Sequence, residues 1–203
     1  MNLKRIYIVS LMMLFTFCAS AQSVKVSFGI TGGGAATQML TEPRLPSSMY
    51  MGGYGGVFAT VNPLKKMGVR IGANYLMQGG NYQMGKVPVT LSQSYVNIPV
   101  SLMYHPKSFI SFEAGLYQNV LMSSRLLEQG KTTIEVNPDD GALKYNIGAL
   151  AGVSFNLSKA VFINLRYCYG LSYSYAIMGT GYKSNVITAG LGVNLIRTKN
   201  RAF

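Results

Sequence analysis

Apolar residues alternate with small or polar residues most clearly in residues 95–117. This period of two predicts two β-strands joined by a tight turn at residues 105–108. The apolar face carries Val96, Ile98, Val100, Leu102 and Tyr104, then Ile110, Phe112, Ala114 and Leu116. The opposite face carries Tyr95, Asn97, Pro99, Ser101 and Met103, then Ser111, Glu113, Gly115 and Tyr117. A soluble sandwich would bury the apolar face, whereas a transmembrane barrel turns it to lipid and fills its lumen with the other face.

The same alternation recurs in six further segments, namely residues 24–36, 50–62, 68–78, 144–157, 161–172 and 185–197. Each is as long as the roughly 9–11 residues that a tilted strand needs to cross a bilayer. In residues 50–62 the glycines leave it open which face is apolar.

The connections between these strands alternate in length. Long connections at residues 37–49, 79–93, 122–143 and 173–184 alternate with short ones at residues 63–66, 105–108 and 158–160. Short periplasmic turns, long external loops and an even strand count are typical of bacterial barrels. We therefore predict an all-β fold, an eight-stranded antiparallel up-and-down transmembrane β-barrel in the outer membrane with both termini periplasmic. The alternative is a soluble, lipocalin-like periplasmic binding barrel.

The N-terminus has the features of a secretory signal peptide. Lys4 and Arg5 precede an apolar run at residues 6–17, and an Ala-x-Ala site ends at Ala21. We expect a signal peptide at residues 1–21, the barrel at residues 22–197 and a short tail at residues 198–203. Cys18 as a lipoprotein acceptor is disfavoured because the preceding residue, Phe17, is bulky.

Removal of the signal peptide lowers the formal net charge from +12 to +10, because two basic residues are lost. It also leaves Cys168 as the one cysteine of the mature chain, so no intramolecular disulfide can form.

Strand parity places several polar side chains in the lumen. Arg70, Glu113 and Arg166 are expected to point inward, with Glu113 bridging the two arginines, since buried ions must pair or meet water. Hydrogen bonds would be completed by Asn74, Asn97, Asn164 and Tyr117. Small barrels are just wide enough to be filled by side chains, so we expect this network to plug the lumen. Because the basic groups outnumber the acid, the alternative is a narrow, anion-preferring pore for small solutes.

Basic residues collect on the predicted periplasmic side, and that side carries no acidic residue. They are Lys65, Lys66, Lys107, Lys159, Arg197, Lys199 and Arg201, and we call them the basic rim. Such a rim suits lipid phosphate or an acidic envelope protein. The expected partners are therefore outer-membrane lipids and envelope proteins, the latter through the rim or the external loops, of which residues 122–143 are the best candidate. Nucleic acid is not implied, because the charge is scattered and the protein is exported.

The chain offers little for catalysis or for cofactors. Its one histidine, His105, stands beside a proline in a predicted turn, and there is no Gly-x-Ser-x-Gly elbow. His105 and Cys168 belong to different parts of the barrel, so metal ligation by this pair is not expected. Residues 137–141 could hold calcium but have the composition of a turn first. We predict no catalysis, no metal site and no cofactor.

Four short motifs resemble a known family. They are residues 95–100 (YVNIPV), residues 113–117 (EAGLY), residues 146–148 (NIG) and residues 166–171 (RYCYGL). Together they are similar to the PorT-like "porin family" of outer-membrane β-barrels of Bacteroidota. The resemblance implies the fold and the outer-membrane location. PorT itself is associated with a protein-secretion system, but most of its relatives have no assigned role. Many outer-membrane strands end the chain at an aromatic residue, whereas Phe203 lies beyond the expected last strand.

Overall fold

The computed structural model describes residues 25–41, 47–84, 87–128, 131–136, 144–172, 174–177 and 180–198. Its strands are β1 (Lys25–Thr41), β2 (Ser47–Ser48), β3 (Tyr50–Asn62), β4 (Met67–Met84), β5 (Val87–Lys107), β6 (Ile110–Glu128), β7 (Lys131–Val136), β8 (Tyr145–Asn156), β9 (Val161–Gly170), β10 (Ser174–Ile177) and β11 (Thr180–Arg197). The predicted signal peptide and nearly all of the predicted tail lie outside the described residues. Across those residues, no helix has the length and apolar character needed to span a membrane.

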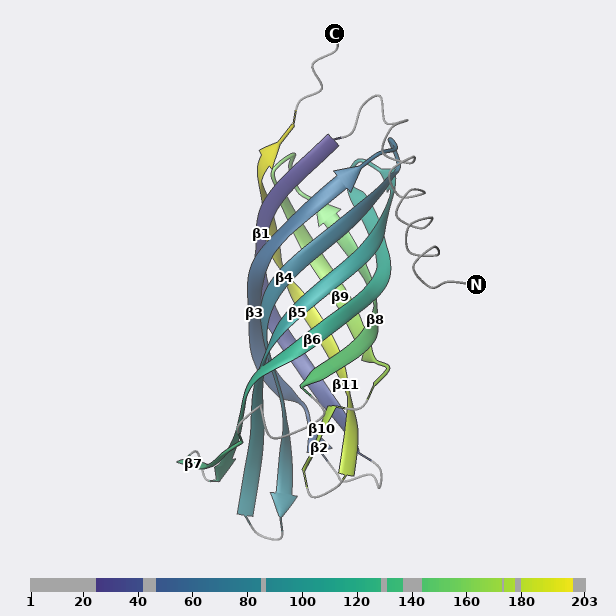
Figure 1. Ribbon diagram of the computed structural model, residues 1–203. Coiled ribbons are helices and arrows are strands. Elements are labelled where there is room, and N and C mark those ends of the chain that lie inside the picture. The colour runs from purple at the N-terminus through teal and green to yellow at the C-terminus, as the bar shows by residue number, and fades with distance from the viewer. Residues whose placement is uncertain are drawn as a thin grey trace, which may run out of the picture.

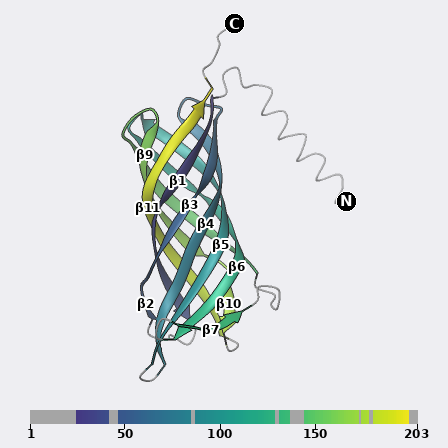
Figure 2. The ribbon, with the colours of Figure 1, turned by 90° about the vertical axis from the view of Figure 1, so that its left-hand side faces the viewer.

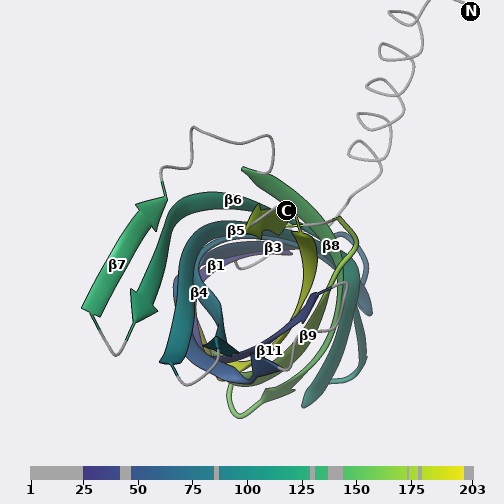
Figure 3. The ribbon, with the colours of Figure 1, turned by 90° about the horizontal axis from the view of Figure 1, so that it is seen from below.

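Eight of these strands form a closed antiparallel ring (Figure 1). Their order is β1, β3, β4, β5, β6, β8, β9 and β11, and β11 pairs with β1 to close the ring. The strands run obliquely to the long axis of the barrel (Figure 2), and the view along that axis shows β7 outside the ring (Figure 3). Closure pairs the backbone groups that a membrane could not solvate. The predicted fold, an eight-stranded up-and-down barrel, is confirmed.

The two ends of the barrel differ. At one end, which we call the turn end, β1 begins, β11 finishes and short connections join β3 to β4, β5 to β6 and β8 to β9; it lies at the top of Figure 1. At the opposite end, which we call the hairpin end, the strands continue well past the ring. There β4 and β5 stay paired out to Met84 and Val87. The prediction of a loop at residues 79–93 was therefore wrong, since nearly all of this segment is strand.

Smaller strands extend the hairpin end further. β2 pairs with β4, β7 pairs with β6, and β10 pairs with β11. The long connections predicted at residues 37–49, 122–143 and 173–184 are thus partly strand. Outside a membrane such segments need not be apolar on one face, so the period-two signal that revealed the ring fades there.

The predicted turn at residues 105–108 is also misplaced. β5 continues to Lys107, which pairs with Ile110, and the turn is formed by Ser108 and Phe109. The pairing is irregular between Tyr104 and Lys107. Pro106 falls in this irregularity, where a residue without an N–H group is tolerated in a strand.

The ring turns its apolar side chains outward, as the alternation predicted. Many large apolar residues are 45–62% exposed, including Phe28, Ile30, Val57, Ile71, Val100, Leu102, Phe112, Leu116, Ile147, Phe155, Leu165, Ile187 and Leu191. They come from all eight strands of the ring. An apolar surface of this extent is far larger than a soluble monomer exposes. The soluble, lipocalin-like alternative, which would bury these faces, is therefore wrong.

Inward-facing glycines make room for aromatic rings in the narrow interior. A Cβ atom on Gly148 of β8 would overlap the ring of Tyr117, and one on Gly192 of β11 would overlap the ring of Phe162. Both rings are buried. The missing side chains on two strands thus allow large rings from the neighbouring strands to fill the lumen.

Candidate functional site

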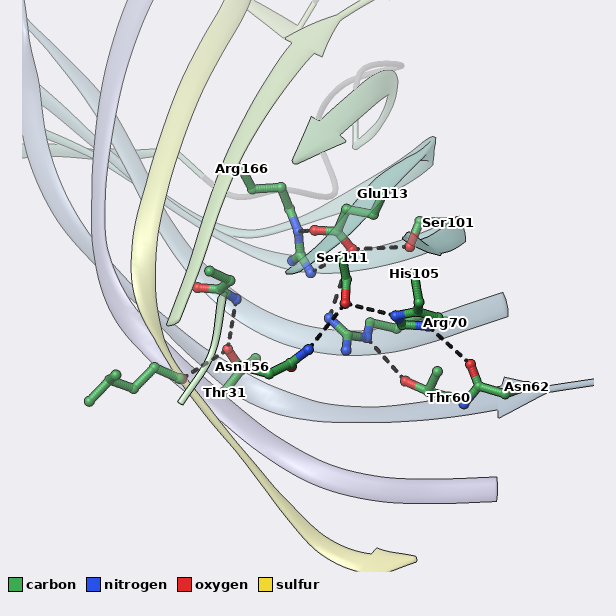
Figure 4. A network of polar contacts seen from close by, with 12 residues as sticks. Thr31, Thr60, Asn62, Arg70, Ser101, His105, Ser111, Glu113, Asn156 and Arg166 are labelled. Atoms are coloured by element: carbon green, nitrogen blue, oxygen red, sulfur yellow. Dashed lines mark hydrogen bonds and ion pairs between the residues drawn. The ribbon is translucent and has the colours of Figure 1, made fainter. Parts of the chain in front are cut away.

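A buried cluster of charged side chains lies in the lumen, where Arg70 of β4, Glu113 of β6 and Arg166 of β9 meet (Figure 4). Arg166 donates two hydrogen bonds to Glu113, with 2.5 Å between Nε and Oε1 and 3.3 Å between Nη2 and Oε2. Arg70 Nη1 lies 3.9 Å from Glu113 Oε2, and Ser101 Oγ donates to the same oxygen over 3.3 Å. Glu113 is only 4% exposed, Arg70 8% and Arg166 7%. The cluster therefore buries one more positive charge than negative charge.

Two aromatic rings hold the guanidinium group of Arg70. Its Cζ atom lies 4.7 Å from the ring centroid of Phe58 and 5.0 Å from that of Phe162. The two rings pack edge to face with centroids 5.6 Å apart. Arg70 Nε also donates to Thr60 Oγ1 over 3.1 Å. Desolvated cation–π contacts are worth about 2 kcal/mol, so these rings offset part of the cost of burying a second cation beside one carboxylate.

A row of asparagine side chains follows the neighbouring strands β4, β5 and β6, farther from the turn end than Arg70 and Glu113 on β4 and β6. Asn74 Nδ2 donates to Asn97 Oδ1 over 3.5 Å, and Asn97 Nδ2 donates to Asn119 Oδ1 over 2.6 Å. Tyr54 of β3 reaches across the lumen to β9, where its Oη atom donates to Asn164 Oδ1 over 2.7 Å. Two cavities of about 10 Å³ adjoin these residues, and each has room for about one water molecule.

The lumen also contains an apolar layer, which the sequence analysis did not predict. It consists of Ala35, Tyr54, Leu76, Tyr117, Leu150, Cys168 and Val186. We expected Tyr117 to complete the polar network, but its hydroxyl group has no hydrogen-bond partner among the described residues. The expectation was wrong because the Tyr117 ring lies against Gly148 and packs in this apolar layer instead.

The turn end opens into a cavity of about 920 Å³, which we call the vestibule. Its floor lies inside the barrel and includes the buried side chains of Arg70, Ser111 and Phe162. Four residues of the predicted basic rim line its wall, namely Lys65, Lys107, Lys159 and Arg197, and Lys25 joins them. Lys66 is exposed at the same end but is not among the lining residues, while Lys199 and Arg201 lie outside the described residues.

His105 lies in the vestibule wall rather than in a turn, and it forms a short chain of hydrogen bonds (Figure 4). Its Nδ1 atom is 2.7 Å from Ser111 Oγ, and its Nε2 atom is 3.2 Å from Asn62 Oδ1. Asn156 Nδ2 also donates to Ser111 Oγ over 3.4 Å. This order of serine, histidine and amide matches that of a hydrolytic triad.

Two features argue against a nucleophilic role for Ser111. Its side chain is 2% exposed, so a substrate carbonyl could not reach it. It also lies within β6, where Ser111 pairs with Ser154 and the backbone N–H groups belong to the sheet ladder. Backbone N–H groups are therefore not free to form an oxyanion hole. Within the described part of the chain, no group of three or more His, Cys, Asp or Glu residues could hold a metal ion.

Several lumen residues were missed by the sequence analysis. Phe58 and Phe162 flank Arg70, and Asn119 extends the row of asparagines. The signal for Phe162 was present, because it stands two residues before Asn164 and shares its parity. Phe58 was missed because β3 is rich in glycine, and the sequence did not show which of its residues point inward.

The geometry defines the class of protein as a closed eight-stranded transmembrane β-barrel with a polar interior. A family model described as "Outer membrane protein beta-barrel domain" matches residues 20–176, which is more than half of the chain. The protein belongs to this family of outer-membrane β-barrels. The narrower resemblance to the PorT-like group of Bacteroidota stays a prediction. No curated protein sequence matches the chain.

Solved structures show the same fold at low sequence identity. The attachment invasion locus protein Ail of Yersinia pestis is 12% identical, with a TM-score of 0.53, and the match covers 87% of this chain and 99% of Ail. Neisserial surface protein A is 16% identical, with a TM-score of 0.55, and the match covers 84% of this chain and 99% of that protein. At these identities the likeness concerns the barrel alone.

Proposed function

We propose that this outer-membrane barrel has a structural or interaction role in the cell envelope, without catalysis and with a plugged lumen. The observation that carries the proposal is the buried cluster of Arg70, Glu113 and Arg166, in which the guanidinium group of Arg70 lies over the rings of Phe58 and Phe162. An eight-stranded barrel is narrow enough for such side chains to fill its cross-section. The amide row and the apolar layer fill further parts of the lumen, which also supports a plug.

Single-channel recording tests the plug directly. The purified barrel is inserted into planar lipid bilayers, and we expect no reproducible conductance steps. Reproducible steps from the wild-type protein that change in Arg70→Ala or Arg166→Ala would contradict the plug. They would support the narrow, anion-preferring pore that the excess of positive charge in the cluster would otherwise suit.

Membrane insertion is tested by fractionation and by heat-modifiability. The exposed apolar band supports contact with lipid around the whole ring. We expect the protein in the outer-membrane fraction, with a mobility on SDS gels that shifts only after boiling. A protein that is recovered in the soluble periplasmic fraction and shows no such shift would contradict the proposal.

The turn end is proposed to face the periplasm and the hairpin end to face the outside. Short connections gather at the turn end and extended hairpins at the other, the asymmetry that bacterial barrels show. The test uses a membrane-impermeant maleimide, since the native thiol of Cys168 is buried. Glu128→Cys at the hairpin end should be labelled in intact cells. Lys66→Cys at the turn end should be labelled only after the outer membrane is permeabilised, and the reverse pattern would overturn this orientation.

The absence of catalysis is tested at the one constellation that resembles a triad. The purified barrel should hydrolyse neither short-chain nor long-chain p-nitrophenyl esters above the background rate. Ser111→Ala serves as the matched variant. Turnover by the wild-type protein that disappears in this variant would show that Ser111 is a nucleophile despite its burial.

A further inference from the structure

The vestibule gathers positive charge without any matching negative charge. Five exposed basic residues line its wall: Lys25, Lys65, Lys107, Lys159 and Arg197. None of the described residues that line it is acidic. Glu113, the nearest acid in the lumen, lies beneath the floor and is already engaged by Arg166 and Arg70. A concave site lined by one sign of charge focuses the electric field and raises the local concentration of counter-ions.

Contacts with the wall hold two of these cations in place. Arg197 Nη1 donates to the backbone oxygen of Lys159 over 2.8 Å, which fixes the guanidinium group between β11 and the β8–β9 turn. The Lys107 ammonium group lies 5.7 Å from the ring centroid of Phe109 in the β5–β6 turn. Cations that are positioned before binding lose less conformational entropy when an anion arrives.

Neutral hydrogen-bonding groups line the space between the cations and the floor. Those that are at least partly exposed are Asn62, His105, Asn156, Ser158 and Asn194. Hydroxyl and amide groups of this kind donate readily to phosphate oxygens. The cavity volume of about 920 Å³ falls within the range of small-molecule sites, roughly 300–1,000 Å³. Charge, donors and size together describe a site for a compact ligand with several negative charges.

We propose that the vestibule binds a small, soluble anion that carries several phosphate groups. The inference rests on the proposed function only for the compartment, the periplasm, from which the ligand would come. Lipid headgroups surround the barrel on its outside, whereas Arg70, Ser111 and Phe162 place the floor of the vestibule inside the ring. A ligand reaches that floor along the barrel axis, which favours a soluble molecule over a headgroup anchored in the bilayer.

The test is isothermal titration of the folded barrel in zwitterionic detergent with inorganic tripolyphosphate. We expect saturable binding with one site per barrel and weaker binding of monophosphate. Lys65→Gln and Lys107→Gln should each weaken binding about threefold to tenfold near 0.15 M salt, as one lost charge beside a multivalent anion implies. The gel mobility shift on boiling verifies that each variant is folded.

Lys66→Gln is the matched control, because it removes the same charge from the neighbouring residue without touching the vestibule lining. It should bind like the wild-type protein. Equal weakening by Lys65→Gln and Lys66→Gln would overturn the proposal in favour of diffuse rim electrostatics, and so would the absence of saturable binding. Conductance and orientation are measured separately from these titrations. A failure of the anion-binding proposal can therefore be told apart from a failure of the proposed function.

A second experiment distinguishes a soluble ligand from a lipid headgroup. The titration is repeated with the barrel in phosphatidylcholine vesicles that contain or lack one-fifth phosphatidylglycerol. Tripolyphosphate binding that persists in both supports a soluble ligand. Binding that is abolished by phosphatidylglycerol would overturn that assignment, because an anionic headgroup would then occupy the same basic residues.

Discussion

Replacing the one carboxylate of the lumen cluster should destabilise the barrel strongly. In Glu113→Gln the side chain keeps its shape but loses its charge, so two guanidinium groups remain without an anion. Either orientation of the new amide also turns an NH₂ group toward an arginine, since Arg166 donates to both carboxylate oxygens. Removing one partner of a buried ion pair costs roughly 3–5 kcal/mol. The burial of all three side chains leaves little room for water to compensate.

The measurement is urea-induced unfolding in lipid vesicles, followed by the fraction that still migrates as the folded form on unboiled gels. Glu128→Gln is the control, because it makes the same change at an exposed position of β6. We expect the unfolding midpoint of Glu113→Gln to fall well below that of Glu128→Gln. Equal midpoints would refute the argument that this carboxylate compensates the buried cations.

A double variant examines the same reasoning from the other direction. Glu113→Gln with Arg166→Gln removes one charge of each sign and leaves Arg70 in contact with Phe58 and Phe162. Part of the lost stability should return relative to Glu113→Gln alone. Groups in direct contact usually show coupling energies of about 0.5–3 kcal/mol in such a cycle. Strictly additive losses would show that the pair is not coupled.

Two further predictions concern the packing of the lumen. Gly148→Ala should lower the unfolding midpoint, because its Cβ would overlap the Tyr117 ring and such overpacking costs about 1–3 kcal/mol. Gly34→Ala is the control and should leave the midpoint unchanged, since a Cβ there meets nothing within 4 Å. Equal midpoints for the two variants would contradict this packing. The thiol of Cys168 should resist maleimide in the folded barrel and react after boiling in SDS, because it is buried within the apolar layer. Mass spectrometry measures the labelling. Rapid labelling of the folded form would show that water reaches this layer.

Strand parity was enough to identify the ring and the inward direction of its charged residues. Lipid outside and polar groups inside make the two faces chemically different, so a period of two is visible in the sequence. Parity does not give the register between neighbouring strands. The register depends on irregularities such as the one between Phe28 and Gly29 of β1, where Leu195 of β11 is left without a partner. Parity alone therefore does not give which lumen residues meet across the barrel. The meeting of Glu113 with Arg70 and Arg166 was predicted correctly because buried ions must pair, and not because of the strand register.

The apolar layer was missed for a related reason. An inward position was taken to mean a polar residue, but a lumen too narrow for water can be filled as well by Leu76, Leu150 or Tyr117. The extent of β4 and β5 was missed because their outer halves are not held to the lipid pattern. Sequence periodicity thus predicts the part of the barrel that contacts lipid. It does not predict the strand extensions or the lumen packing, where side chains contact only each other or water.

The buried arginines of the cluster and the exposed lysines of the vestibule should differ in how the stability of the barrel responds when a charged group is removed. Arg70 and Arg166 are buried, and Glu113 offsets much of the cost of burying their charges. Lys65 of the vestibule is exposed, and the described residues that line the vestibule near it include other cations and no acid, so its charge adds nothing to folding in the absence of a ligand. Lys65→Gln should therefore leave the unfolding midpoint unchanged or raise it slightly, and tripolyphosphate should raise the midpoint of the wild-type protein more than that of the variant. A lower midpoint for Lys65→Gln without any anion would mean that this lysine stabilises the fold and would remove the reason to assign the vestibule charges to a ligand.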